Sequence, residues 1–228
     1  GETITLTAAV LTGGDGELDF NGSAEIEGSF NITGSAGADT IKGGLGTDTL
    51  NGGADGIDVF YTYKGNDVVD LGETTGDKDK WYMSGAANSS SNLDTITNFE
   101  AGASKDILDL TSLAAFNNTT TEALHALTTF NDSGADNDNI LVLNTENYYA
   151  NAAAVLDTLA EGNTTIGSAV HTAAAQVVVA YQAASGGNVR IAQATLANAG
   201  GFTAVTDLAI LSGVTSITTL AATNFVLD

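Results

Sequence analysis

The sequence contains no cysteine and no proline among its 228 residues. Without cysteine the chain has no disulfide and no thiolate metal site, which excludes a disulfide-stapled fold. No stretch reaches the roughly 18 consecutive apolar residues that a membrane span needs, and no N-terminal signal pattern is present. The chain does not begin with Met, and we expect Gly1 to be the cut edge of a longer protein.

Basic residues are also scarce. Six Lys and Arg stand against 28 Asp and Glu, which gives a formal charge of −22. Such a charge repels nucleic acids and anionic membranes, so we expect no nucleic-acid partner and no membrane insertion. Hydrophobic residues still make up 43% of the chain, unlike a disordered acidic tail. The composition therefore predicts a buried core among carboxylates that need counter-cations.

Sequence motifs of the common enzyme classes are missing as well. There is no HExxH zinc motif, no GxSxG nucleophile motif and no Walker loop. The two histidines, His125 and His171, lie far apart in sequence and have no evident Asp or Ser partner. We interpret both as half-buried polar residues and expect that the chain itself is not an enzyme.

A nine-residue period is the strongest positive feature of the sequence. Four units in a row have Gly at the fourth position, Asp at the sixth and an apolar residue at the eighth. The units are GSAGADTIK (34–42), GGLGTDTLN (43–51), GADGIDVFY (53–61) and TYKGNDVVD (62–70), with the apolar residues Ile41, Leu50, Phe60 and Val69.

Weaker copies of the unit flank this run. Residues 25–33 have Phe30 in place of the aspartate, and residues 74–82 keep Asp79 and Trp81 but misplace the glycine. Terminal repeats are typically atypical because they cap a stack. We therefore predict that these two copies end the run.

The spacing suits a turn that binds calcium. Glycines let six residues turn with their backbone carbonyls directed inward, and the next three residues form a short strand whose middle side chain faces the core. Ca²⁺ prefers six to eight oxygen ligands from carboxylates and carbonyls. One turn supplies half of such a cage and the turn stacked on it supplies the rest. A Gly/Asp-rich surface loop without an ion is the alternative, which we disfavour because stacked carboxylates repel one another.

The pattern G-G-x-G-x-D-x-U-x is that of RTX calcium-binding repeats, and four in-phase units make the chain resemble this family of secreted bacterial proteins. The resemblance implies a parallel β-roll with Ca²⁺ as its cofactor. Alternate turns face the same side, so Asp39 and Asp58 should face one column of ions, and Asp48 and Asp67 the other. The predicted metal ligands are Gly37, Asp39, Gly44, Gly46, Asp48, Gly56, Asp58, Gly65, Asp67, Asp79, Asp94 and Asp106.

Two parts of this assignment are less regular. Thr62 and Tyr63 depart from the repeat pattern in the unit that contains Asp67. The segment LDTITNFEAGASKDILDLTSL (93–113) is similar to the segment that closes many RTX rolls, of the form DxIxxF…G…DxIDL, with aspartates at the matching places. Of these, Asp106 is either a further Ca²⁺ ligand or a solvated turn residue. The matching aspartates are Asp94, Asp106 and Asp109.

The amino-acid composition changes near residue 110, where longer runs of Ala, Thr, Val and Leu begin. Helical spacing predicts helices over 121–130 and 149–162, the second capped by Asn151 and ended by Gly162. The segments 175–182 and 187–195 predict a β-hairpin around SGG. We therefore predict a mainly all-β chain in three parts: an N-terminal β segment with a degenerate repeat cap (1–33), a β-roll with its closing segment (34–110), and a β-rich C-terminal region with one or two short helices (111–228).

The end of the chain resembles the end of type I secretion substrates. In that family the export signal is C-terminal, uncleaved and poor in basic residues. It sometimes ends in a polar residue followed by three apolar ones, which Asn224-Phe225-Val226-Leu227 matches loosely. An ordinary final strand is the alternative interpretation of this segment.

Three functions share such a scaffold, all of them secreted and located outside a bacterium or on its surface. We favour a calcium-dependent structural domain of a surface-layer-like protein that self-associates into a lattice. The alternatives are the calcium-binding and secretion domain of an RTX hydrolase, such as a protease or lipase with its catalytic part upstream, and an adhesin. A cell-surface glycan is a candidate partner. Tyr61, Tyr63, Tyr148 and Tyr149 are candidates for a sugar-stacking surface, with ordinary core or surface aromatics as the alternative.

Overall fold

The computed structural model describes residues 1–8, 16–72, 76–83, 93–113, 124–126, 140–143, 148–159, 176–196 and 201–227. These residues are mostly β-strand, which confirms the mainly all-β class, and they form one ten-stranded and one six-stranded sheet. Among the residues described, no helix is both long and apolar enough to cross a membrane.

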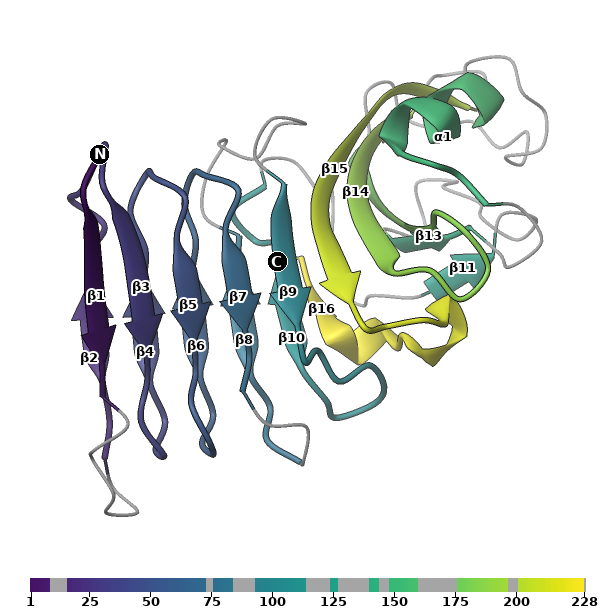
Figure 1. Cartoon of the computed structure of the whole chain (residues 1–228). Coiled ribbons are helices and arrows are strands. Elements are labelled where there is room, and N and C mark those ends of the chain that lie inside the picture. The colour runs from purple at the N-terminus through teal and green to yellow at the C-terminus, as the bar shows by residue number, and fades with distance from the viewer. Residues whose placement is uncertain are drawn as a thin grey trace.

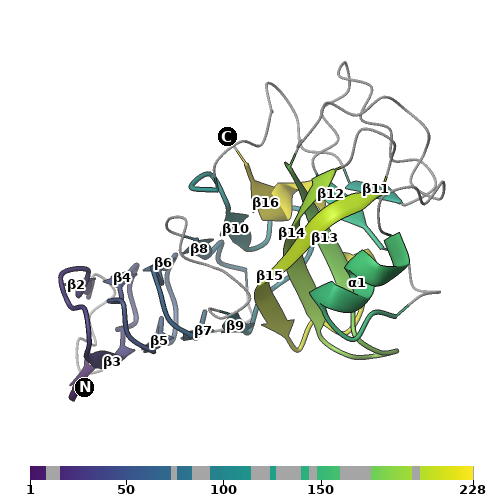
Figure 2. The same cartoon turned by 90° about the horizontal axis from the view of Figure 1, so that it is seen from above.

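Short strands in the N-terminal half alternate between the two sheets along the chain, and neighbours within each sheet run parallel (Figure 1). Figure 2 shows the two rows from above. We call residues 3–109 the stack. The ten-stranded sheet takes from the stack β1 (Thr3–Thr7), β3 (Ser29–Thr33), β5 (Thr49–Asn51), β7 (Val68–Asp70) and β9 (Asp94–Thr97). The six-stranded sheet takes β2 (Asp19–Asn21), β4 (Thr40–Lys42), β6 (Val59–Tyr61), β8 (Lys80–Tyr82) and β10 (Ile107–Asp109).

Each nine-residue unit contributes one three-residue strand, as its spacing predicts. The strand begins directly after the sixth-position aspartate. Because side chains alternate across a strand, the middle residue faces the space between the sheets while its neighbours face outward. This narrow space is the core of the stack, and its fully buried residues include Ile41, Leu50, Phe60, Val69 and Trp81.

Strand pairing adds a coil of the stack that the sequence search did not detect. β2 pairs with β4, which places Phe20 opposite Ile41 in the core-facing row. The sequence GGDGELDFN (13–21) is therefore in phase with the repeats, with Leu18 at the sixth position. Leucine in place of the aspartate makes this unit harder to recognise from the sequence than the four regular units.

The ten-stranded sheet continues from the stack into the C-terminal part of the chain. β9 pairs in parallel with the long strand β15 (Phe202–Ser212), and β15 pairs antiparallel with β14 (Val189–Leu196). β14 forms the predicted hairpin with β13 (Gln176–Gln182), which confirms that prediction. β12 (Ile140–Val142) and β11 (Leu124–Ala126) complete the sheet. The predicted boundary near residue 110 therefore does not separate the sheets.

One helix prediction holds and one is wrong. The helix α1 (Ala152–Leu159) lies inside the predicted range 149–162, and Asn151 caps it because its Oδ1 accepts the N–H of Ala154 at 3.0 Å. Gly162 lies outside the described residues. The range 121–130 contains the strand β11 where we expected helix, since pairing with β12 outweighs local helical spacing.

The chain ends in the six-stranded sheet. Two short 3₁₀ helices, η1 (Ile217–Thr219) and η2 (Ala222–Asn224), lead into β16 (Phe225–Val226), which pairs in parallel with β10. Phe225 is 1% exposed. The segment considered as an export signal is thus a final strand in the folded chain, as the alternative interpretation stated, and its role in export stays a prediction.

Candidate metal centre

The sixth-position aspartates form two ladders, one along the start of each row of strands. Within a ladder, the backbone N–H of one aspartate donates to Oδ1 of the aspartate in the next coil of the same sheet. The structure thus places Asp39 with Asp58 and Asp48 with Asp67, the pairing expected from alternating turns. Ladder 1 contains Asp39, Asp58, Asp79 and Asp106, joined at 2.8, 2.7 and 3.1 Å. Ladder 2 contains Asp48, Asp67 and Asp94, joined at 2.8 and 3.0 Å.

The second carboxylate oxygen turns back toward the aspartate's own turn. Asp39 Oδ2 accepts the N–H of Ser35 at 2.6 Å, and Asp48 Oδ2 accepts the N–H of Gly44 at 2.7 Å. One carboxylate therefore ties its own turn to the neighbouring coil. A Cβ at Gly34 would lie 2.1 Å from Asp39 Oδ2, so the leading position of that turn leaves no room for a side chain.

All seven ladder aspartates are at most 2% exposed. The donors described above are neutral backbone N–H groups, which stabilise a carboxylate without cancelling its charge. Burial removes water from a charge at a cost of several kcal/mol per ion, unless an opposite charge compensates. Two columns of buried carboxylates therefore call for cations along the ladders.

Asp67 shows most directly that the described donors leave carboxylate charge uncompensated. Its Oδ2 is buried and has no hydrogen-bond partner among the described residues. Burial, with the charge of Asp94 as a second cause, raises the pKa of Asp67 to about 9. Burial also raises the pKa of Asp106 to about 6 and lifts that of Asp48 above its ordinary value. In the cation-free fold these three groups hold their protons to a higher pH than an ordinary aspartate does.

The irregular unit before Asp67 adapts without losing its place in the ladder. The Thr62 hydroxyl donates to Asp94 Oδ2 at 2.8 Å and accepts from the indole N–H of Trp81 at 3.2 Å. Tyr63 adopts a φ of 59°, a conformation that usually requires glycine. The only tryptophan of the chain is therefore linked to ladder 2 through one hydroxyl, which makes its fluorescence a direct probe of the site.

The C-terminal end holds the last turn of ladder 1 in place. The side-chain amide of the fully buried Asn224 donates to the carbonyl of Asp106 at 2.7 Å and to that of Gly102 at 3.1 Å. Its Oδ1 accepts the N–H of Gly102 at 2.9 Å. Asn224 is far from this turn in sequence, so no local pattern could identify it. Asp109, by contrast, lies outside the ladder and accepts from the hydroxyl of Thr111 at 2.7 Å.

The donor set fits Ca²⁺ better than a transition metal. Across the part of the chain that the structure describes, no three His, Asp or Glu side chains gather as they would in a carboxylate or imidazole centre. Each cage would combine one or two ladder carboxylates with turn carbonyls, which are the hard oxygen ligands that Ca²⁺ takes. The glycines named as ligands from sequence all lie in these turns: Gly37, Gly44, Gly46, Gly56 and Gly65.

Two of the four tyrosines considered for a sugar-stacking surface pack against other side chains. The ring of Tyr61 lies flat against that of Tyr82, with centroids 4.6 Å apart and planes 11° apart. The ammonium group of Lys42 lies 5.1 Å from the centroid of the Tyr61 ring. Tyr149 is buried and packs edge-on against Tyr181. The rings of Tyr61 and Tyr149 are therefore engaged within the protein, whereas Tyr148 is 42% exposed.

Comparison with known proteins adds no assignment. No protein-family model matches the chain, and no curated protein matches it. The resemblance of the repeats to the RTX family stays a prediction, and function is inferred from the ladders.

Proposed function

We propose that the chain is a calcium-dependent structural domain of a secreted bacterial surface protein, and that its stack is a β-roll that folds when Ca²⁺ binds along the two ladders. The observation that carries this proposal is the alignment of seven buried aspartates in two columns, with Asp67 Oδ2 left without a partner. When bound, Ca²⁺ supplies positive charge to the carboxylates and takes turn carbonyls as further ligands.

The energetic reason is that the stack has little else to hold it together. Each repeat places one apolar side chain in the narrow core, while it buries one carboxylate in the turn. The gain from one such side chain is about 1.5–3 kcal/mol, which is of the same size as the cost of burying an uncompensated charge or smaller. Metal binding is then part of the folding free energy, as in other small metal-dependent domains.

A biological consequence follows from where Ca²⁺ is abundant. Cytosolic Ca²⁺ is low, so the stack is expected to stay unfolded inside the cell and to fold after export. The acidic surface left on the folded chain then suits cation-bridged contacts between copies in a surface lattice. We assign no catalytic role to the chain.

Calcium titration of the chelated protein tests this proposal. We expect far-UV circular dichroism to gain strand signal and Trp81 fluorescence to shift to the blue on addition of Ca²⁺. Asp58→Asn removes a ladder charge and should move the midpoint to higher Ca²⁺. Asp55→Asn changes an exposed carboxylate of the same turn and should leave the midpoint unchanged. Native-like strand content in excess chelator would contradict calcium-dependent folding.

Particle sizing in the same titration separates the structural role from its alternatives. A lattice protein should form ordered oligomers or sheets at millimolar Ca²⁺, beyond the folding of single chains. A species that folds on Ca²⁺ but stays monomeric, with no attachment to cells, would instead favour the domain of a secreted hydrolase.

A further inference from the structure

The ladders end at the N-terminal side of the stack because apolar residues occupy the next ladder positions. β1 pairs with β3, which sets Ile4 opposite Phe30, and the register of β3 with β5 sets Phe30 beside Asp48. On the other sheet, the register of β2 with β4 sets Leu18 beside Asp39. The first three coils thus carry Ile4, Leu18 and Phe30 where all later coils carry aspartate.

The backbone of the Phe30 coil keeps the ladder geometry. The N–H of Phe30 donates to Asp48 Oδ1 at 2.8 Å, the same bond that joins Asp48 to Asp67. The turns also stack alike. A Cβ at Gly46 would lie 2.0 Å from the carbonyl oxygen of Gly28, and a Cβ at Gly65 would lie 2.2 Å from that of Gly46. The carbonyl framework of the site therefore continues into this coil.

The Phe30 ring fills the space at the end of the column. Phe30 is 5% exposed and meets Phe20 edge-on, with centroids 5.0 Å apart. Glycines make room for the ring on both sides. A Cβ at Gly22 would lie 2.3 Å from a ring carbon of Phe30, and one at Gly44 would lie 3.3 Å from it.

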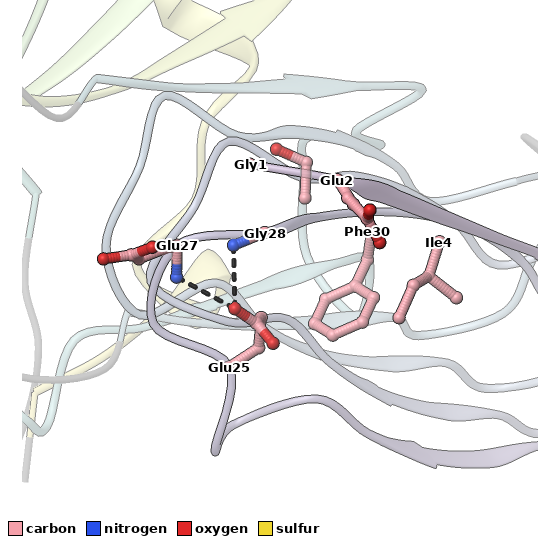
Figure 3. A pocket seen from close by; sticks show the side chains of 8 residues that line it. Gly1, Glu2, Ile4, Glu25, Glu27, Gly28 and Phe30 are labelled. Atoms are coloured by element: carbon pink, nitrogen blue, oxygen red, sulfur yellow. Dashed lines mark hydrogen bonds between the residues drawn. The ribbon is translucent and has the colours of Figure 1, made fainter.

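Glu25 accepts the backbone N–H groups of the turn that a sixth-position aspartate would otherwise accept. In a regular turn, the sixth-position carboxylate accepts the N–H of the second residue, as Asp48 does from Gly44. Here Glu25 Oε1 accepts the N–H groups of Ile26, Glu27 and Gly28, at 3.1, 2.9 and 2.8 Å. Figure 3 shows the bonds from Glu27 and Gly28. The turn is thus organised by one partly exposed carboxylate and one ring, without a ladder carboxylate.

We infer that residues 25–33 form a metal-independent stop for ladder 2, and that Phe30 alone determines that the ion column ends at Asp48. Restoring a carboxylate at this position should open one further Ca²⁺ site between this turn and the turn of Asp48. This inference rests on the proposed function, because it needs the ladders to bind Ca²⁺.

Calcium stoichiometry from isothermal titration of the full chain tests the inference. Phe30→Asp should bind one more Ca²⁺ per chain than the wild type. Asparagine is nearly the same size as aspartate, so Phe30→Asn removes the ring without adding a charge. This variant should bind the wild-type number of Ca²⁺ ions. A folded Phe30→Asp chain with the wild-type number of ions, or an equal gain in Phe30→Asn, would overturn the inference. A wild-type chain that binds no Ca²⁺ would instead refute the proposed function.

A second variant covers the case in which Phe30→Asp does not fold. Phe30→Asp with Glu25→Gln removes the neighbouring carboxylate, so that the new aspartate can accept the turn N–H groups. Circular dichroism and Trp81 fluorescence at saturating Ca²⁺ report its folding independently of stoichiometry. A folded double variant with one additional ion supports the inference. A double variant that stays unfolded, or that folds without the additional ion, overturns it.

Discussion

Two regions of this chain bury aspartates, and they compensate the charge by different means. In the C-terminal part, the buried Asp207 lies 3.1 Å from the guanidinium of Arg190 and accepts the hydroxyl of Tyr181. In the stack, the ladder carboxylates face neutral donors, which are backbone N–H groups and the hydroxyls of Ser35 and Thr62. The chain places its only base after Lys105 beside Asp207, so the C-terminal part carries its own counter-charge.

The apolar core is also broader in the C-terminal part than in the stack. In the C-terminal part, Val155 and Leu159 of α1 pack against Val177, Val179 and Tyr181 in one apolar cluster. The stack has a core one side chain deep in each coil. Among the described residues of the C-terminal part, the buried Asp207 is thus compensated within the protein. We therefore expect calcium dependence to be concentrated in the stack.

The largest effect should come from a charge placed in the core of the stack. Leu50 is fully buried in the apolar core of the stack, where an unpaired carboxylate is very costly. Leu50→Asp should abolish folding of the stack at every Ca²⁺ concentration, measured by circular dichroism. Thr49→Asp adds the same charge at an exposed position of the same strand and should still fold. Rescue of Leu50→Asp by high Ca²⁺ would mean that residue 50 faces the ions.

A smaller effect, independent of calcium, is expected at Asp207. Asp207→Ala leaves the partly buried Arg190 guanidinium without its partner, and because breaking a fully buried pair costs about 3–5 kcal/mol, the loss here should stay below that range. Hydrogen exchange in β13–β15 should show this loss equally with and without Ca²⁺. Asp157→Ala, on the exposed face of α1, is the matched control and should change little. A loss that appears only in chelator would tie the two regions together and break the comparison.

Acid should partly replace calcium in the stack. The pKa of Asp67 is raised to about 9 in the cation-free fold, against about 3.9 in an unfolded chain. Because the folded pKa is the higher one, this stabilisation is fully present below about pH 4 and is lost as pH rises through about 9. Chelated protein should therefore gain strand signal on acidification from pH 8 to pH 5. Asp67→Asn should flatten this dependence of strand signal on pH. If the variant keeps the wild-type pH profile, protonation of Asp67 is not the cause of the dependence.

The smallest effects should resolve the two ladders from each other. Asp48→Ala removes one carboxylate and no core residue, so it should raise the Ca²⁺ midpoint and leave the loaded fold intact. Coupling in double-mutant cycles should follow the hydrogen bonds. Asp39 with Asp58 should deviate from additivity by about 0.5–3 kcal/mol, while Asp39 with Asp48 should be near additive. Stronger coupling between consecutive aspartates would rule out alternating ladders.

Much of the stack was predictable because its rules are local. A turn of six residues and a strand of three residues repeat the same short-range geometry, so the spacing alone identified the buried row that includes Ile41 and Leu50. The helix at 121–130 was mispredicted for the opposite reason. Its strand Leu124–Ala126 exists because β12 pairs with it, and that partner is not visible in a local window.

Three of the ladder aspartates could not be placed by the nine-residue spacing alone. Asp79, Asp94 and Asp106 do not follow the nine-residue period, yet strand register brings them into line with the regular aspartates. Loops of different length between strands leave the register unchanged, because the strands and not the loops determine the stacking.

The sequence by itself determined the repeat and the place of each sixth-position aspartate, because these depend on short-range backbone geometry, while the alternation of the turns was an expectation from the RTX resemblance that strand pairing bears out. Only the tertiary structure decided that Leu18 ends the row of aspartates in ladder 1, that Asn224 holds the turn of Asp106, and that β15 joins β9. These contacts join segments distant in the chain, and they form only when strands from both ends of the sequence share a sheet.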